Sequence, residues 1–142
     1  MALARILGLD VGSKRIGVAV SDPLGITAQG VCVINRKESN SDMDQIRRII
    51  DEYTAEVVVV GLPLNMNGTR GKSVEIVDEF IKALGARIDI SIKTYDERLT
   101  TMESEKFLIS SDVSRKKRKE VVDMLAAQLM LQSYLGATKT FK

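Results

Sequence analysis

The sequence predicts an α/β domain with a central mixed five-stranded sheet flanked by helices. Two observations indicate this fold class. The first third of the chain is a series of short β-rich runs separated by Gly, Ser, Pro or Asp, and the remainder alternates between helical and strand periodicity. A chain of 142 residues, of which 44% are hydrophobic and 28% charged, suffices for one globular domain over residues 1–142.

The first three strands are expected over residues 4–11, 15–21 and 26–34. Because the segments between them are short, these strands should pair as an antiparallel meander. A fourth strand is expected at residues 57–63, which are continuously apolar and β-branched up to the final Gly-Leu-Pro, as in a central strand covered on both faces. The fifth strand is expected at residues 88–97.

Two helices are expected between the later strands. Apolar residues recur at helical spacing in residues 39–56, where Ser41 and Asp44 form an acidic variant of a capping box. Residues 73–84 also carry an apolar face, and Gly85 should end that helix in the left-handed conformation.

Two more helices are expected after the fifth strand. Thr100 and Glu103 form a capping box, which predicts a helix that begins just after Thr100 and ends near Ser110. Residues 121–136 are apolar over most of a helical circumference, so the last helix should pack between the sheet and another surface. The predicted order is therefore βββαβαβαα.

Several classes of chemistry are excluded by residues that the chain lacks. It contains no histidine, which removes histidine general bases and imidazole metal ligands. Its single cysteine, Cys32, can form neither an internal disulfide nor a cysteine-rich zinc site. The N-terminal residues lack the apolar core of a signal peptide and no run is long enough to span a membrane, so we expect a cytoplasmic protein.

Three acidic residues occupy positions where apolar side chains are expected. Asp10 interrupts a strand, Glu97 ends another, and Asp123 shares a helix face with apolar and small residues. Buried carboxylates that lie together need a cation to offset desolvation and mutual repulsion. Mg²⁺ and Mn²⁺ prefer oxygen ligands, so the three acids predict a site for one or two such ions. Such a site can hydrolyse a phosphodiester without histidine.

Each acid also has a purely structural interpretation. Asp10 is closely followed by a glycine and could be a turn residue. If the last helix began only about one turn earlier, Asp123 would complement the helix dipole. Either Asp96 or Glu97 could simply pair with Arg98. The three acids taken together favour the metal site more than any one of them does.

Four segments resemble the motif regions of the YqgF (RuvX) family: GLDVGSKRIGVAVSD, VVGLPLNMNGT, DERLTT and KEVVDMLAAQLMLQSYL. Together they span nearly the whole chain. That family is similar to the ribonuclease H and Holliday-junction resolvase superfamily, so the resemblance implies a ribonuclease H-like nuclease domain. It further implies a cytoplasmic nuclease that matures the 5′ end of pre-16S ribosomal RNA, or a Holliday junction resolvase that cuts four-way DNA.

The resemblance also implies roles for individual residues. The superfamily's first-strand acid falls on Asp10, its strand-end acid on Glu97 and its last-helix acid on Asp123, so these three are expected to be catalytic residues and metal ligands. Asp96 remains an alternative to Glu97. Strand alternation sends the two side chains to opposite faces, so at most one of them should bind a metal directly.

Basic residues adjoin every part of the predicted site. A positive rim around an acidic centre is typical of a phosphate-binding surface, although the basic run before Asp123 could equally be a solvated helix start. The chain has no Trp and only three Tyr and three Phe, so recognition of RNA or structured DNA should depend on backbone and shape. The predicted contacts are Lys14, Arg15, Arg70, Lys72, Arg98, Arg115, Lys116, Lys117 and Arg118.

Other functions were compared with the motifs in the sequence. The RGKS sequence resembles the end of a P-loop, but Met66 stands where the first glycine is required. Asp10 stands where a dinucleotide-binding turn needs its second glycine, which disfavours a dinucleotide-binding fold. An actin-like ATPase encloses its nucleotide between two domains, and a chain of this length is expected to form one. The alternative without enzyme activity is an RNA-binding module, in which the acids are structural. A homodimer would suit symmetric junction cutting, which needs two sites related by a two-fold axis.

Overall fold

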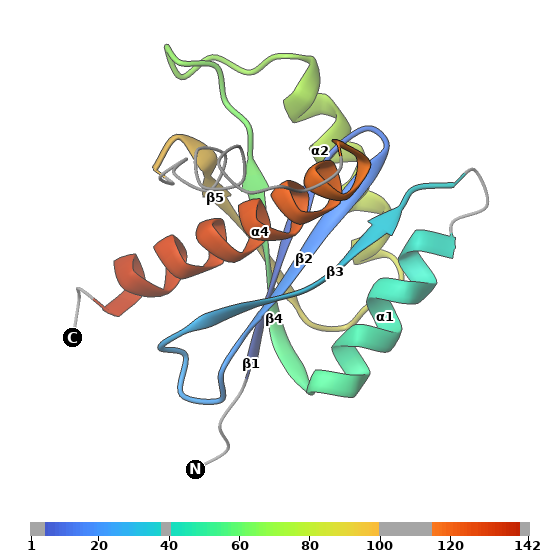
Figure 1. The fold of residues 1–142 in the computed structure, drawn as a ribbon, viewed down its shortest axis with the longest axis vertical. Coiled ribbons are helices and arrows are strands. Elements are labelled where there is room, and N and C mark those ends of the chain that lie inside the picture. Colours follow the sequence, from blue (N-terminus) through green and yellow to red (C-terminus); the bar gives the residue numbers. More distant parts are fainter. Residues whose placement is uncertain (1–4, 38–40, 100–114, 140–142) are drawn as a thin grey trace.

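The structure is built on one mixed sheet of five strands (Figure 1). The strands are β1 (Arg5–Val11), β2 (Arg15–Ser21), β3 (Ala28–Asn35), β4 (Ala55–Leu62) and β5 (Ser91–Asp96). Their spatial order is β3-β2-β1-β4-β5, with β1, β2 and β3 antiparallel and β4 and β5 added in parallel to β1. The computed structural model describes residues 5–37, 41–99 and 115–139, and the side chains of the last segment over residues 121–138. The predicted mixed sheet and its opening meander are confirmed.

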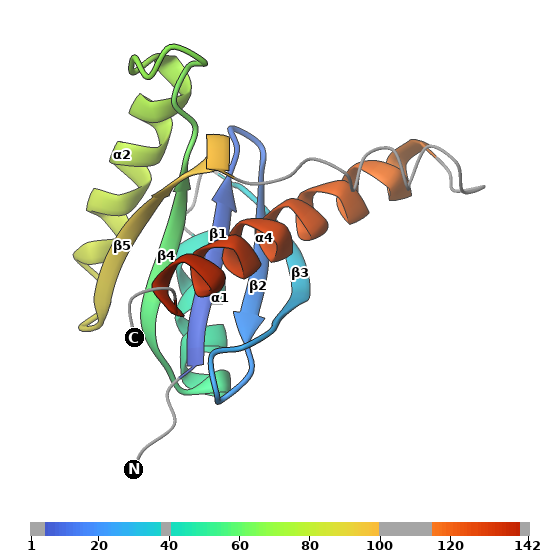
Figure 2. The same ribbon diagram turned by 90° about the vertical axis from the view of Figure 1, so that its left-hand side faces the viewer.

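Helices cover both faces of this sheet. The helices α1 (Ser41–Tyr53) and α2 (Lys72–Gly85) pack on one face, and α4 (Arg115–Lys139) crosses the other (Figure 2). A single 3₁₀ turn, η1 (Glu97–Leu99), follows β5. Among the described residues, no helix combines the length and the apolar character needed to cross a membrane.

Alternation along β1 divides the core between the two faces of the sheet. Leu7, Leu9 and Val11 belong to the larger cluster, which α1 and α2 cover. Successive strand residues point to opposite faces, so Gly8 and Asp10 face α4 instead. The cluster on that side consists of Ala19, Ala28, Ala127, Leu131 and Leu135. Asp10 therefore lies on the face where the sheet presents mostly small residues.

Strand glycines let α4 approach the sheet closely. A Cβ atom at Gly17 would overlap the backbone carbonyl oxygen of Asp123, and one at Gly8 would lie 2.9 Å from the Cβ of Leu131. Gly17 is also the cross-strand partner of Asp10. Directly opposed residues of an antiparallel pair share a face, so the missing side chain at Gly17 allows the backbone of Asp123 to sit beside Asp10.

The predicted helix ends differ from the observed ones. Gly85 is the last residue of α2, and the next residue, Ala86, has right-handed dihedral angles (φ −75°, ψ −11°). The predicted left-handed glycine cap is therefore wrong, because the helix closes with the Ala86 N–H donating to the Lys82 carbonyl. The capping box at Thr100 and Glu103, and the helix expected to end near Ser110, lie outside the described residues.

The predicted capping box at Ser41 and Asp44 is also wrong. Ser41 is already the first residue of α1, and its buried hydroxyl has no hydrogen-bond partner among the described residues. The neighbouring Asp42 is the acid engaged at this helix start, since its carboxylate accepts the Met43 N–H and pairs with Arg36.

Candidate active site

Asp10 lies inside β1 and not in a turn. Its position pairs with Gly17 of β2, so the turn interpretation is wrong. Its side chain is half-buried on the α4 face of the sheet. Burial raises the pKa of Asp10; a hydrogen bond with Glu97 acts in the opposite direction, and the negative charge of Asp123 raises the pKa further. The two other predicted acids thus both act on this carboxyl group.

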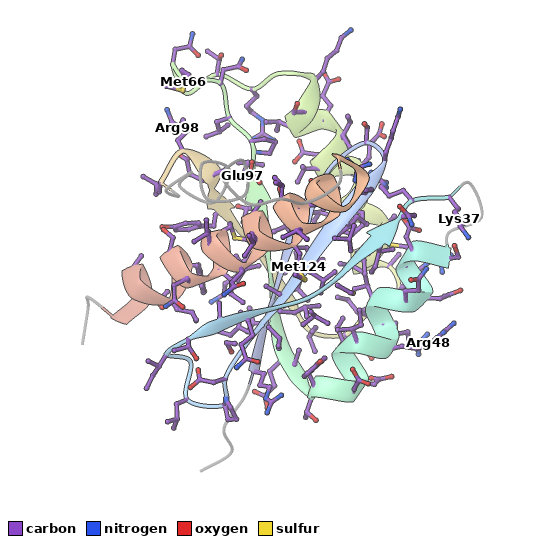
Figure 3. All side chains as sticks on the ribbon, viewed as in Figure 1. Lys37, Arg48, Met66, Glu97, Arg98 and Met124 are labelled. Carbon is purple, nitrogen blue, oxygen red and sulfur yellow. The ribbon has the colours of Figure 1, made fainter. Side chains whose placement is uncertain are left out.

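Glu97 reaches Asp10 from the end of β5. It is the first residue of η1, and its carboxyl group lies against Gly61 of β4, where a Cβ atom would overlap the Glu97 Oε1. The adjacent residue, Val60, pairs with Leu9, so Gly61 lies beside Asp10 in the sheet. Figure 3 shows Glu97 between the end of β4 and α4. Two strand glycines, Gly17 of β2 and Gly61 near the end of β4, therefore make the space in which the acids meet.

Asp10 and Glu97 form a carboxyl pair that keeps a proton. Burial, followed by the hydrogen bond to Asp10 and the charges of Asp10 and Asp96, raises the pKa of Glu97 from 4.5 to about 9. The pKa of Asp10 is raised as well, so the hydrogen-bonded pair favours keeping one proton between its two carboxyl groups. The shared proton offsets the repulsion that two desolvated carboxylates would otherwise have.

Asp96 points to Arg98 and not to Asp10. The Arg98 Nη2 lies 2.7 Å from the Asp96 Oδ2, and the Arg98 backbone N–H donates to Oδ1 at 3.0 Å. Hydrogen bonds from Arg98 hold the pKa of Asp96 below its ordinary value. The same guanidinium donates to the Met66 carbonyl at 3.3 Å, and both residues lie at the outer rim of the molecule in Figure 3. Of the two alternatives, the structure brings Glu97 to Asp10.

Asp123 lies beside the pair but has a partner of its own. The helix α4 begins at Arg115, so Asp123 is more than two turns inside it and the helix-dipole interpretation is wrong. The Arg15 Nε lies 2.5 Å from the Asp123 Oδ2. Among the described residues, no three His, Cys, Asp or Glu side chains are arranged to hold a metal ion. The structure thus brings the three predicted acids together, with Asp10 and Glu97 as a hydrogen-bonded pair and Asp123 beside them in an ion pair with Arg15.

The predicted basic contacts fall into three groups. Arg15, Arg70 and Arg98 are each paired with an acid, Arg70 through a 2.6 Å contact to Asp78. Lys14 and Lys72 are exposed, one in the turn after Asp10 and the other at the start of α2. The side chains of Arg115, Lys116, Lys117 and Arg118 lie outside the described residues.

Arg36 supports the site and was missed in the sequence. Its guanidinium donates to the Gly12 carbonyl at 3.0 Å, lies 5.5 Å from the ring centroid of Phe80, and approaches the buried Asp42 at 3.4 Å. These contacts join the turn that follows Asp10 to both α1 and α2. Nothing in the local pattern indicates this role, because the partners come from distant parts of the chain.

The donor atoms fit a hard divalent cation. Asp10 and Glu97 present only oxygens, and Asp123 adds a third carboxylate within electrostatic reach of Asp10. A divalent cation between these two desolvated carboxylates would offset their charges more fully than a shared proton does. Asp10 and Glu97 are therefore the residues that could hold Mg²⁺ or Mn²⁺, with Asp123 nearby on Arg15.

The carboxyl pair should make stability depend on pH when no divalent metal is present. Between pH 4.5 and about 9 the folded protein keeps the Glu97 proton and the unfolded chain releases it. The folded state then binds more protons, so the free energy of unfolding should fall by about 1.4 kcal/mol for each unit of rising pH. Glu97→Gln should flatten this slope. Urea unfolding in chelator at pH 6 and pH 8 measures it, and equal slopes for both proteins would contradict the shared proton.

The sequence matches one family over most of its length. The family RuvX, described as Holliday junction resolvase, matches residues 4–137. A protein of Desulforamulus reducens named "Putative pre-16S rRNA nuclease" is 56% identical over 133 residues, which are 94% of this chain and 97% of that protein. A Clostridium botulinum protein of the same name is 52% identical over 131 residues, or 92% of this chain and 96% of that one.

Solved structures show the same fold at low sequence identity. RuvC of T. thermophilus, in complex with a Holliday junction substrate, has a TM-score of 0.60 at 11% identity over 96% of both chains. The Fowlpox virus resolvase, in complex with Holliday junction DNA, has a TM-score of 0.53 at 13% identity over 94% of this chain and 98% of that one. The ribonuclease H-like fold prediction is confirmed. With the match over residues 4–137 and relatives more than half identical, the chain belongs to the RuvX family.

Proposed function

We propose that this protein is a divalent-metal-dependent nuclease that hydrolyses phosphodiester bonds of nucleic acid in the cytoplasm. The observation that carries the proposal is the desolvated Asp10–Glu97 pair, two carboxyl groups within electrostatic reach of the Asp123 carboxylate. Carboxylates are costly to bury together, and the Asp10–Glu97 pair has no arginine or lysine partner among the described contacts, so it suits a bound metal and a phosphate. Membership of the RuvX family supports the same conclusion.

The residues have separable roles in this proposal. Asp10, Glu97 and Asp123 would bind one or two Mg²⁺ or Mn²⁺ ions, which supply a water of lowered pKa and neutralise the leaving oxygen. Glu97 must give up its proton for this to occur, so Glu97 couples metal binding to pH. Arg36 holds the turn after Asp10 in place through the Gly12 carbonyl. The exposed Lys14 and Lys72 would bind backbone phosphates.

The favoured substrate is the 5′ extension of precursor 16S ribosomal RNA. This choice rests on relatives above 50% identity that carry the pre-16S rRNA nuclease name. A four-way DNA junction is the second candidate, because the family is described as Holliday junction resolvase and the fold matches RuvC. Junction cutting would call for a homodimer with two related sites. The alternative to a nuclease is a module that binds RNA and does not cleave it.

One set of incubations separates these functions. Purified protein is incubated with 5′-extended 16S precursor, unstructured single-stranded RNA and a four-way DNA junction, each with Mg²⁺, Mn²⁺ or chelator. The proposal expects cleavage that requires the metal and is greatest with the precursor. Greater cleavage of the junction would select the resolvase function. Binding of every substrate without cleavage of any would select the non-catalytic module and overturn the nuclease proposal.

Nucleic-acid binding should be sensitive to salt. Affinity should fall by at least about ten-fold between ~50 and ~200 mM salt, because bound lysines release counterions from phosphates. The double variant Lys14→Gln, Lys72→Gln should reduce this slope. Arg48→Gln is the matched control, since Arg48 lies on α1, on the opposite side of the molecule from Glu97 (Figure 3). Fluorescence anisotropy titrations measure the slope, and an affinity unchanged over this range would contradict phosphate recognition.

A further inference from the structure

Arg15 and Asp123 were predicted to bind different partners, a phosphate and a metal ion, yet they bind each other. Their contact is a 2.5 Å hydrogen bond between the Arg15 Nε and the Asp123 Oδ2. The Arg15 side chain is 31% exposed and the Asp123 side chain 29% exposed, so solvent and an incoming phosphate can reach both. While this pair is formed, the Asp123 carboxylate is held at Arg15 and the two charges offset each other, which weakens the attraction of each for its predicted partner.

We propose that Arg15 is a positioning residue that keeps Asp123 away from the metal until a nucleic-acid phosphate displaces the carboxylate. This inference rests on the proposed nuclease function and adds a coupling to it. The metal site would be complete only when nucleic acid is bound. In the free protein, Asp10 and Glu97 alone would offer a weaker, two-carboxylate site.

The backbone places Arg15, Asp123 and Asp10 on the same face of the sheet. Arg15 and Gly17 are two residues apart in β2, so both face α4 on the same side of the sheet as Asp10. The Asp123 backbone is held against Gly17, where a Cβ atom would overlap its carbonyl oxygen. With its backbone held there, the exchange that we propose is a rotation of the Asp123 side chain, from Arg15 toward Asp10, whose carboxyl group already senses its charge.

The Arg15–Asp123 pair is more readily exchanged than the other arginine–acid pair at this edge. Arg98 holds Asp96 with its backbone N–H, its Nε and its Nη2, at distances from 2.7 to 3.1 Å. The described contact between Arg15 and Asp123 is a single hydrogen bond from Nε. A guanidinium binds a phosphate in a bidentate manner, so a phosphate can replace one carboxylate contact with two of its own.

The exchange makes nucleic acid and metal bind cooperatively. Phosphate binding at Arg15 frees a carboxylate beside Asp10 and thereby raises the affinity for a divalent ion. By linkage, the ion must raise the affinity for nucleic acid by the same factor. Without nucleic acid, the ion has to break the ion pair before it can gain its third carboxylate.

The first test measures Mn²⁺ affinity without nucleic acid, by isothermal titration calorimetry and electron paramagnetic resonance. Arg15→Gln should bind Mn²⁺ about three- to ten-fold more tightly than wild type, the range expected when a partly exposed ion pair no longer competes. Arg70→Gln removes the same charge from the other loop and should change the affinity much less. In an Asp123→Asn background, Arg15→Gln should have no effect. Melting temperatures establish that each variant is folded.

The second test adds nucleic acid. A phosphorothioate RNA with the 5′-extended 16S sequence, which is cleaved slowly, should tighten Mn²⁺ binding to wild type about five-fold or more and to Arg15→Gln much less. Equal Mn²⁺ affinity of wild type and Arg15→Gln, with and without this RNA, would overturn the coupling but leave the metal site standing. Absence of Mn²⁺ binding to wild type even with RNA would instead overturn the proposed function.

Discussion

Asp10→Asn is expected to reduce phosphodiester cleavage by about 1000-fold or more while the protein remains folded. The substitution keeps the size and shape of the side chain but removes the negative charge that a divalent ion needs. The pKa of Asp10 is already raised by burial, so loss of this buried charge should not lower the free energy of unfolding. Initial rates with Mg²⁺ on the preferred substrate, together with urea unfolding, measure both effects.

Asp96→Asn is the matched control for this variant. It also replaces an aspartate with an asparagine. The described hydrogen bonds of Asp96 come from Arg98, so this acid lies outside the Asp10–Glu97 pair. Its rate should fall by less than about ten-fold, the effect expected of a residue outside the metal site. Glu97→Gln should resemble Asp10→Asn. Equal rates for wild type and Asp10→Asn, or a larger loss in Asp96→Asn than in Glu97→Gln, would show that the acids have been assigned incorrectly.

Gly17→Ala is expected to cost about 3 kcal/mol of folding free energy and about 100-fold in cleavage rate. The added Cβ would overlap the Asp123 carbonyl oxygen, and because that contact is with backbone, α4 must shift as a unit. A shift of α4 carries Asp123 away from Asp10. Stability and activity should therefore fall together.

Alanine substitutions at two other glycines are the controls for Gly17→Ala. A Cβ at Gly30 would meet the Met124 side chain, with 2.7 Å to its Cγ, and a methionine can adjust, so Gly30→Ala should cost only about 1 kcal/mol. A Cβ at Gly136, in α4 itself, would meet no atom of the described residues within 4 Å outside the adjoining turns of the helix. Gly136→Ala should stabilise the helix by about 0.5 to 1 kcal/mol and leave cleavage unchanged. If Gly17→Ala is no more disruptive than Gly136→Ala, the close seating of α4 is not what positions Asp123.

The sheet could be predicted from the sequence because its signals are local. Turn residues separate the first three strands, and the continuous apolar run at 57–63 is typical of a central strand, which β4 is. The face on which Asp10 lies also depends on a local feature. Alternation with Leu9 and Val11 sends its side chain away from the larger core. Glu97 and Asp123 were also noticed as acids at positions that favour apolar side chains, and the resemblance to the RuvX family assigned catalytic roles to all three.

The pairing of the site residues could not be predicted, because it depends on tertiary contacts. Arg15 was expected to bind a phosphate, and only the seating of α4 on Gly17 shows that it pairs with Asp123. Strand glycines at positions 17 and 61 did carry a signal, since a glycine inside a strand often marks a close approach of another segment. Helix ends were the least predictable feature. At Ser41 the capping pattern is present, but the neighbouring Asp42 is engaged by Arg36.

The central claim is that Asp10, Glu97 and Asp123 together bind a divalent ion, and anomalous diffraction from crystals soaked in Mn²⁺ tests it most directly. The account predicts a peak between the Asp10 and Glu97 carboxylates, with Asp123 turned from Arg15 toward the ion when nucleic acid is bound. A peak at another group of acids, or none at this site with nucleic acid present, would contradict it.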